Sequence, residues 1–233
     1  MDIAARWPRP RPQLTEEQQA VINDWYQYWL PTMSAQFSPI TRFNHEYAAR
    51  TAGPGLKTLE IGAGLGEHLR YEPEADRNYY ALELRQELAD GLRSSFPAIQ
   101  TIVGNCQERI DVPDDFFDRV LAIHVLEHLD DLPRALDEVV RVLRPGGSFS
   151  VVIPCEGGLG YHIGRSFSSK RIFEKRYGLD YEWMISYEHV NRAGEIMHEL
   201  DVRFQSLHRQ FYPLRVPSIN FNLVAGLTLT PRR

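Results

Sequence analysis

The residues that most clearly suggest chemistry are an acidic residue and three glycines that follow a short apolar segment. Glu60 precedes Gly62, Gly64 and Gly66, which recur at every second position. Glycine permits positive φ and lets a ligand approach the backbone, so this spacing predicts a strand-to-helix turn that binds a nucleotide-like cofactor. Glu67 stands where a dinucleotide-binding turn has a small residue, which argues against NAD or FAD. The Glu60 carboxylate suits a cofactor that carries an ammonium group.

Four more segments follow this turn in a familiar order. An apolar segment ends in Glu83, another ends in Asn105 and Cys106, and two longer ones cover residues 118–129 and 143–154. With the glycine turn they resemble the class I S-adenosylmethionine (SAM)-dependent methyltransferases, in particular the small-molecule group similar to methyltransferase type 11.

The resemblance implies a set of cofactor contacts. SAM would be the cofactor and S-adenosylhomocysteine its product. Glu83 would accept both ribose hydroxyls, and Asn105 would accept a hydrogen bond from the adenine amino group where the family usually has aspartate. The remaining cofactor-binding positions that it implies are Leu84, Cys106 and His124.

The elements that position these residues alternate between strand and helix. Such alternation is typical of a parallel sheet covered by helices. The resemblance implies a Rossmann-like α/β fold with a seven-stranded, mostly parallel sheet, helices on both faces and a C-terminal antiparallel hairpin. The expected strands are 58–61, 79–83, 100–103, 119–124, 148–154, 203–211 and 221–229, and the expected helices include 16–30, 40–50, 67–71, 86–95 and 131–143.

The chain divides into an arm and one domain. Residues 1–13 are rich in proline and arginine and are expected to form a mobile arm. Residues 14–233 are expected to form a single domain, in which 14–50 is a helical cap rich in aromatic residues that serve as core or lid. Residues 155–188 form a long insertion that departs from the carboxyl end of a strand, where open α/β sheets bind ligands, so it is expected to cover the acceptor.

Composition restricts the partners. The net charge of -5 over 233 residues argues against a nucleic-acid substrate, which normally requires a basic face. No apolar run approaches the roughly 20 residues that span a bilayer, so no membrane helix is expected. The absence of an apolar signal core and the two separated cysteines, Cys106 and Cys155, favour a cytoplasmic location with free thiols.

The insertion contains the candidate residues for acceptor binding. Between positions 165 and 176 it contains several basic residues and a single acidic residue, Glu174. This pattern favours an anionic acceptor, such as a phosphate-bearing or nucleotide-linked sugar or a carboxylated metabolite, although a solvated helix face gives the same pattern. The candidate substrate-binding residues are Tyr161, His162, Arg165, Lys170, Arg171 and Tyr187.

Two histidines are candidates for the catalytic base. The sulfonium of SAM is already an activated leaving group, so the protein must mainly align and desolvate the reactants. An alcohol acceptor must still lose a proton, and a neutral histidine can contribute roughly 100- to 10,000-fold as a base. His189 is the first candidate, with Glu188 as its expected orienting partner, and His124 is the second. Both histidines could equally be pocket-lining or capping residues.

Two other functions remain open. His124, Glu127 and His128 spell H-x-x-E-H, the inverted zincin motif of a zinc hydrolase. That motif requires one helical face, whereas His124 is expected to end a strand, and no paired aspartate or asparagine ligands follow it, so no metal is expected. The second alternative is a non-catalytic module that binds SAM and recognises a partner, and transfer of a labelled methyl group distinguishes it from an enzyme.

Overall fold

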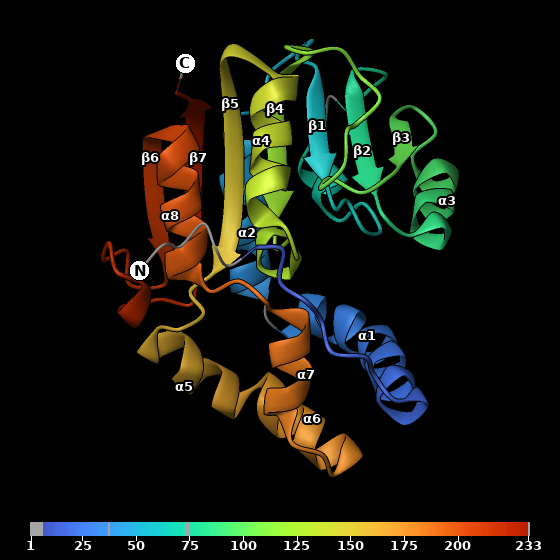
Figure 1. The fold of residues 1–233 in the computed structure, drawn as a ribbon, viewed down its shortest axis with the longest axis vertical. Helices are drawn as coiled ribbons and strands as arrows, with labels where there is room; N and C mark the ends of the chain where they lie inside the picture. The colour runs from blue at the N-terminus through green and yellow to red at the C-terminus, as the bar shows by residue number, and fades with distance from the viewer. Residues whose placement is uncertain (1–6, 37, 73–74, 233) are drawn as a thin grey trace.

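The computed structural model describes residues 7–36, 38–72 and 75–232, which form a central sheet with helices on both sides (Figure 1). The strand order in this part of the chain is β3-β2-β1-β4-β5-β7-β6. β1 to β5 pair in parallel, whereas β7 lies antiparallel between β5 and β6. The predicted seven-stranded Rossmann-like sheet with a C-terminal antiparallel hairpin is therefore confirmed. The strands are Thr58–Ile61 (β1), Tyr79–Glu83 (β2), Gln100–Val103 (β3), Phe117–Ile123 (β4), Leu143–Pro154 (β5), Phe204–Tyr212 (β6) and Val224–Pro231 (β7).

The α-helices form two groups. α2, α3, α4 and α8 pack along the sheet, whereas α1, α5, α6 and α7 lie beyond the carboxyl ends of the parallel strands (Figure 1). No helix among the described residues is long and apolar enough to cross a membrane. The helices are Glu16–Gln36 (α1), Ser38–Ala49 (α2), Gln86–Ser95 (α3), Leu132–Val142 (α4), Leu159–Phe167 (α5), Ser169–Tyr177 (α6), Tyr181–Glu188 (α7) and Ala193–Arg203 (α8).

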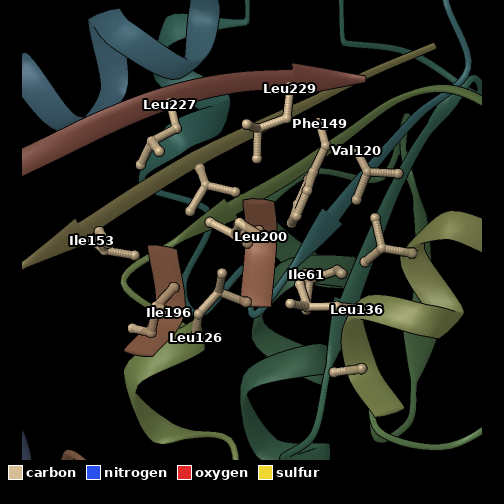
Figure 2. Close-up of a cluster of buried hydrophobic side chains, with 14 of the residues drawn as sticks. Ile61, Val120, Leu126, Leu136, Phe149, Ile153, Ile196, Leu200, Leu227 and Leu229 are labelled. Atoms are coloured by element: carbon tan, nitrogen blue, oxygen red, sulfur yellow. The ribbon is translucent and has the colours of Figure 1, made fainter. Parts of the chain in front are cut away.

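The parallel strands are apolar on both faces. Alternate residues of a strand point to opposite faces, and parallel sheets are normally covered on both. On one face Val120 shares a core cluster with Leu136 of α4 and Leu200 of α8 (Figure 2). On the other face Leu121 belongs to the same cluster as Leu92 of α3. All five side chains are fully buried, so the two faces of the sheet are filled by the core. Functional groups are therefore left to the carboxyl ends of the strands.

Several element boundaries differ from the sequence prediction: α1 continues to Gln36 instead of ending at 30, β5 begins at Leu143 instead of 148, and β7 begins at Val224 instead of 221. α4 begins as expected, because the Asp131 side chain caps it by accepting from the Arg134 N–H at 3.3 Å. The glycine turn, however, leads into a short 3-10 helix, His68–Tyr71 (η2), instead of an α-helix that starts at Glu67. β4 ends one residue early, because His124 has φ +53° and leaves the strand.

The cap and the insertion share a second, smaller core. Trp25 of α1 packs edge-on against Phe173 of α6, with ring centroids 5.2 Å apart, and against Tyr181 of α7 at 6.4 Å. Each of these three side chains is at most 4% exposed. The aromatic residues of α1 therefore act as core, and they attach the N-terminal cap to the segment that was expected to cover the acceptor.

The arm that the sequence predicted to be mobile lies against the domain over its described part. Arg9 forms an ion pair with Glu195 at 2.8 Å, and Arg11 forms one with Asp130 at 2.6 Å. Both arginines are mostly buried by these contacts. Residues 1–6 of the predicted arm lie outside the described residues. From residue 7 onward the arm contacts residues that are far away in sequence.

A buried ion pair joins the start of β4 to the residue that follows η2. Arg119 of β4 is 1% exposed and donates to Glu72 at 2.7 Å, to the Ala48 carbonyl at 2.7 Å and to the Thr51 hydroxyl at 2.8 Å. Burial raises the pKa of Glu72, but hydrogen bonds from His68 and Arg119 outweigh it and hold that pKa below its usual value. Glu72 is therefore a buried carboxylate that depends on Arg119 for charge compensation.

Arg119→Ala should lower the free energy of unfolding by about 3–5 kcal/mol, because it leaves the Glu72 carboxylate buried without its partner. The destabilisation should shrink as the pH falls below 4.5, since the depressed pKa of Glu72 means that its stabilising contribution is lost once the group is protonated. Urea denaturation at several pH values measures both effects. Arg93→Ala, which removes an exposed pair with Asp90, is the control and should cost about 1 kcal/mol or less.

Candidate active site

The three glycines form the turn that the sequence predicted. Gly62, Gly64 and Gly66 have φ of +69°, +56° and +79°, a region that favours glycine. A Cβ at Gly62 would come within 2.6 Å of Val125, and one at Gly66 would come within 2.6 Å of Phe96. A Cβ at Gly64 would have no atom within 4 Å among the described residues. Packing therefore requires the outer two glycines, while the middle one faces open space in which a ligand can approach the backbone.

Glu83 joins the end of β2 to this turn. Its Oε2 accepts from the Gly64 N–H at 3.0 Å, and its Oε1 accepts from the Arg85 N–H at 3.1 Å. The residue is only 5% exposed, so the carboxylate is held in place. Three large apolar side chains are exposed near Glu83, at the carboxyl ends of the first three strands. These are Leu65, Leu84 and Val103, which are 57%, 65% and 38% exposed. An adenine ring could pack against an apolar surface of this kind.

Glu83→Ala should weaken SAM binding by about 1.5–3 kcal/mol, the range for hydrogen bonds to a charged group. Isothermal titration calorimetry with SAM measures the change. Glu83→Gln keeps one acceptor oxygen and should lose less, and Glu87→Ala, an exposed position on α3, should bind like the wild type. Unchanged affinity in Glu83→Ala would mean that the ribose hydroxyls are bound elsewhere.

Glu60 is buried in β1, below the glycine turn. Its carboxylate is 4% exposed and accepts from the Tyr79 hydroxyl at 2.7 Å. Burial raises the pKa of Glu60. The Glu60 carboxylate is thus hydrogen-bonded to a residue of the neighbouring strand β2. Its contact with an ammonium group of a cofactor stays a prediction.

The predicted adenine corner contains Asn105 and Cys106. Asn105 Oδ1 accepts from the backbone N–H of Gln107 at 3.0 Å and from its side-chain amide at 3.1 Å. Burial raises the pKa of the Cys106 thiol to about 12, so this group is protonated at neutral pH. Asn105 orders the loop after β3, and its bond to adenine stays a prediction.

His124 lies at the carboxyl end of β4, directly after the strand. Its Nδ1 pairs with Glu127 Oε1 at 3.1 Å, and its Nε2 lies 2.9 Å from the Asn44 side-chain amide nitrogen. Burial raises the pKa of Glu127, but His124 and the neighbouring histidines outweigh it and hold that pKa at about 2. Only Leu126–His128 is helical here, as a 3-10 turn. The helical face that the inverted zincin motif requires is therefore not formed.

A cavity of about 1070 Å³ lies under the insertion. Of the predicted acceptor and catalytic residues, Tyr161, His162, Arg165 and His189 line it, whereas Lys170, Arg171, Tyr187 and His124 do not. None of the predicted cofactor residues is among the described residues that line it. The sequence analysis missed Arg9, Glu156, Glu182, Arg192 and Glu195 in the lining. No local pattern marks these residues, because they come from the arm, the insertion and the start of α8.

His189 is paired with Glu156 inside this cavity. Its Nδ1 forms a hydrogen bond with the Glu156 carboxylate, whereas the Glu188 carboxylate accepts from the Tyr26 hydroxyl. The expectation that Glu188 orients His189 was wrong, because neighbouring side chains at the end of α7 point apart. Burial lowers the pKa of His189, but the hydrogen bond and charge of Glu156 outweigh it and raise that pKa above its usual value.

The basic residues of the insertion are largely paired with acids. Arg165 contacts Glu156 at 3.3 Å and Glu182 at 2.9 Å, and Lys170 contacts Glu182 at 3.0 Å. The basic patch that the sequence suggested is thus partly neutralised by Glu182, which lies on α7. The Arg165 Nε–H is buried and has no hydrogen-bond partner among the described residues, so it leaves one donor for an acceptor molecule.

Comparison with known proteins agrees with this geometry. Residues 59–151 match a family described as a methyltransferase domain. A malonyl-[acyl-carrier protein] O-methyltransferase of Pectobacterium atrosepticum is 32% identical over 126 residues, which cover 53% of this chain and 49% of that protein. A sterol 24-C-methyltransferase of Yarrowia lipolytica is 29% identical over 156 residues, which cover 59% and 40%. The chain thus spans about half the length, or less, of these curated relatives.

A solved structure shows the same fold. A TehB-like SAM-dependent methyltransferase from Corynebacterium glutamicum matches with a TM-score of 0.61 at 16% identity, over 92% of this chain and 100% of that chain. The two curated relatives differ in the atom that receives the methyl group, oxygen in one and carbon in the other, so they leave the acceptor of this chain open. In its motifs, its strand order and the match of residues 59–151 to a methyltransferase domain, this chain is similar to the class I SAM-dependent methyltransferases.

Proposed function

We propose that this protein transfers the methyl group of SAM to an oxygen or nitrogen atom of a small molecule bound in the cavity beside His189. The observation that carries the proposal is the open space at Gly64 next to the held carboxylate of Glu83. A backbone that glycine leaves open to a ligand, beside an acceptor for two hydroxyls, fits the ribose and methionine parts of SAM. The cavity beside His189 supplies room for a second molecule.

SAM supplies an activated methyl group when it is bound, so the residues of this chain mainly orient the reactants and move a proton. The Gly64 N–H donates to the Glu83 carboxylate and so fixes it at one side of the proposed cofactor site. Glu156 accepts from His189 Nδ1, which leaves Nε2 with a lone pair that can accept the proton of an acceptor hydroxyl. His124, at the end of β4, has both ring nitrogens engaged by Glu127 and Asn44, which favours His189 over His124 as the base.

We further propose that the acceptor carries an anionic or strongly oxygen-rich group. The Arg165 Nε–H is a buried donor without a partner in the described structure, and the exposed Arg192 lies in the same lining. The Arg165 guanidinium is paired with Glu156 and Glu182, but its buried Nε–H is left without a partner among the described residues, which costs free energy that a carboxylate or phosphate oxygen would remove. Glu182 shares the lining and balances part of this charge, which favours an acceptor with hydroxyl donors beside the anion.

Arg165→Ala should raise the KM for the acceptor while SAM affinity stays unchanged, because Arg165 lines the acceptor cavity and contacts no predicted cofactor residue. Steady-state kinetics together with SAM calorimetry separate the two effects. Arg171→Ala is the control, since Arg171 is exposed on α6 and lies outside the lining. Equal increases in the KM for the acceptor in both variants would indicate that the whole basic patch, and not the cavity, binds the acceptor.

Transfer of radiolabel from methyl-labelled SAM tests the function itself. The panel should contain hydroxylated and aminated small molecules, sugar phosphates and carboxylated thioesters. Label that appears in an acceptor, with release of S-adenosylhomocysteine, supports the enzyme. Tight SAM binding without transfer to any member of the panel would favour the non-catalytic binding module.

A further inference from the structure

A cluster of metal-binding side chains lies between the loop after β4 and the loop before α8. Glu127, His128 and His189 each offer one ligand atom, and these atoms lie within 4.8 Å of one another. The rings of the two histidines are 4.8 Å apart between centroids and nearly perpendicular, at 83°. Ligands bound about 2.1 Å from one tetrahedral ion are separated by about 3.4 Å, so modest side-chain rotations would bring the three atoms to that distance.

Both histidines hold the proton on the same ring nitrogen. His128 Nδ1 lies 2.9 Å from the Glu188 carbonyl oxygen, which can only accept, so Nδ1 must donate. His189 Nδ1 donates to the Glu156 carboxylate. Each neutral imidazole therefore keeps its lone pair on Nε2. Histidines that bind metals usually donate their other nitrogen to a carboxylate or a backbone carbonyl, which are the two partners found here.

The third member has an unsatisfied oxygen. Glu127 is 1% exposed, and its Oε1 pairs with His124, but its Oε2 has no hydrogen-bond partner among the described residues. Leaving a buried carboxylate oxygen without a partner costs free energy. A cation held between this oxygen and the two histidines would remove that cost.

We propose that Glu127, His128 and His189 bind one divalent transition-metal ion through Glu127 Oε2 and the two Nε2 atoms. Two imidazoles and one carboxylate form a donor set that suits Zn²⁺ and leaves a fourth position for water. This set differs from the inverted zincin motif, because His124 is replaced by His189 from a distant part of the chain. The ion and a transferred proton compete for the same His189 lone pair, so the metal-free protein is the form in which His189 acts as a base.

The test uses full-length protein without a histidine tag, stripped of metal by a chelator. Titration with Co²⁺ should produce visible d–d absorption that saturates at one equivalent, and Zn²⁺ should then abolish it, because Zn²⁺ binds nitrogen and oxygen sites more tightly. The measurement needs neither SAM nor an acceptor, so it is independent of the proposed function. Wild-type protein that shows no saturable absorption and retains no Zn²⁺ after desalting would overturn the proposal.

Variants identify the ligands. His189→Ala should weaken Co²⁺ binding by more than the roughly 10- to 100-fold that loss of an outer partner costs, and Glu156→Gln should lose about 10- to 100-fold. His124→Ala should still bind, which excludes the inverted zincin set. His198→Ala, an exposed position on α8, is the matched control and should bind like the wild type. A loss in His198→Ala equal to that in His189→Ala would show that binding is non-specific.

Discussion

Gly64→Val is expected to abolish SAM binding while the protein remains folded. Two effects act together: φ of +56° strains a branched residue, and the new side chain would project into space that is free of described protein atoms. The second effect is specific to the cofactor, because the glycine is the place where a ligand can approach the backbone. Calorimetry with SAM and with S-adenosylhomocysteine should detect no binding.

The chain contains a matched control for the strain alone. Gly178, at the end of α6, has φ of +67° and, like Gly64, would place a Cβ where no described atom lies within 4 Å. Gly178→Val therefore imposes a similar backbone cost far from the predicted cofactor residues. Its SAM affinity should match that of the wild type. Normal affinity in Gly64→Val, or equal losses in both variants, would contradict the assignment of this turn to the cofactor.

His189→Ala is expected to lower kcat by roughly 100- to 10,000-fold for a hydroxyl acceptor, the usual contribution of a positioned base. SAM affinity should remain unchanged, because His189 lines the acceptor cavity and not the glycine turn. The loss should shrink at high pH if solvent hydroxide can take the proton instead. An unaltered kcat would leave alignment alone to explain the rate.

The pH dependence gives a sharper test of the same pair. Only neutral His189 can accept a proton, so kcat should rise with pH through the pKa of His189, which Glu156 raises above its usual value. Glu156→Gln removes that charge and should move the rise in kcat to lower pH. A rise at the same pH in both proteins would show that another group titrates. His198→Ala, outside the cavity, should leave the profile of the wild type.

The geometry of the glycine turn could be predicted largely because its signals are local. The positive φ of Gly62, Gly64 and Gly66 follows from their spacing after a strand, and Glu83 follows from the end of the next apolar segment. Strand and helix periodicities depend on neighbours a few residues away, so the order of elements was also accessible, whereas the C-terminal antiparallel hairpin was implied by the family resemblance. The early end of β4 at His124 was missed, because a positive φ at a non-glycine residue depends on the surrounding packing.

The acceptor half was decided by tertiary structure. Glu156 and not the adjacent Glu188 pairs with His189, Glu182 neutralises Arg165, and Arg9 of the arm enters the cavity lining. These contacts join residues from the arm, the insertion and α8, whose relative positions depend on how short helices pack beyond the strand ends. The order of residues alone determined that basic residues gather in the insertion. Which of them stays available to a ligand depended on carboxylates that folding brings close, because charge pairing acts through distance in space and leaves no periodic trace in the sequence.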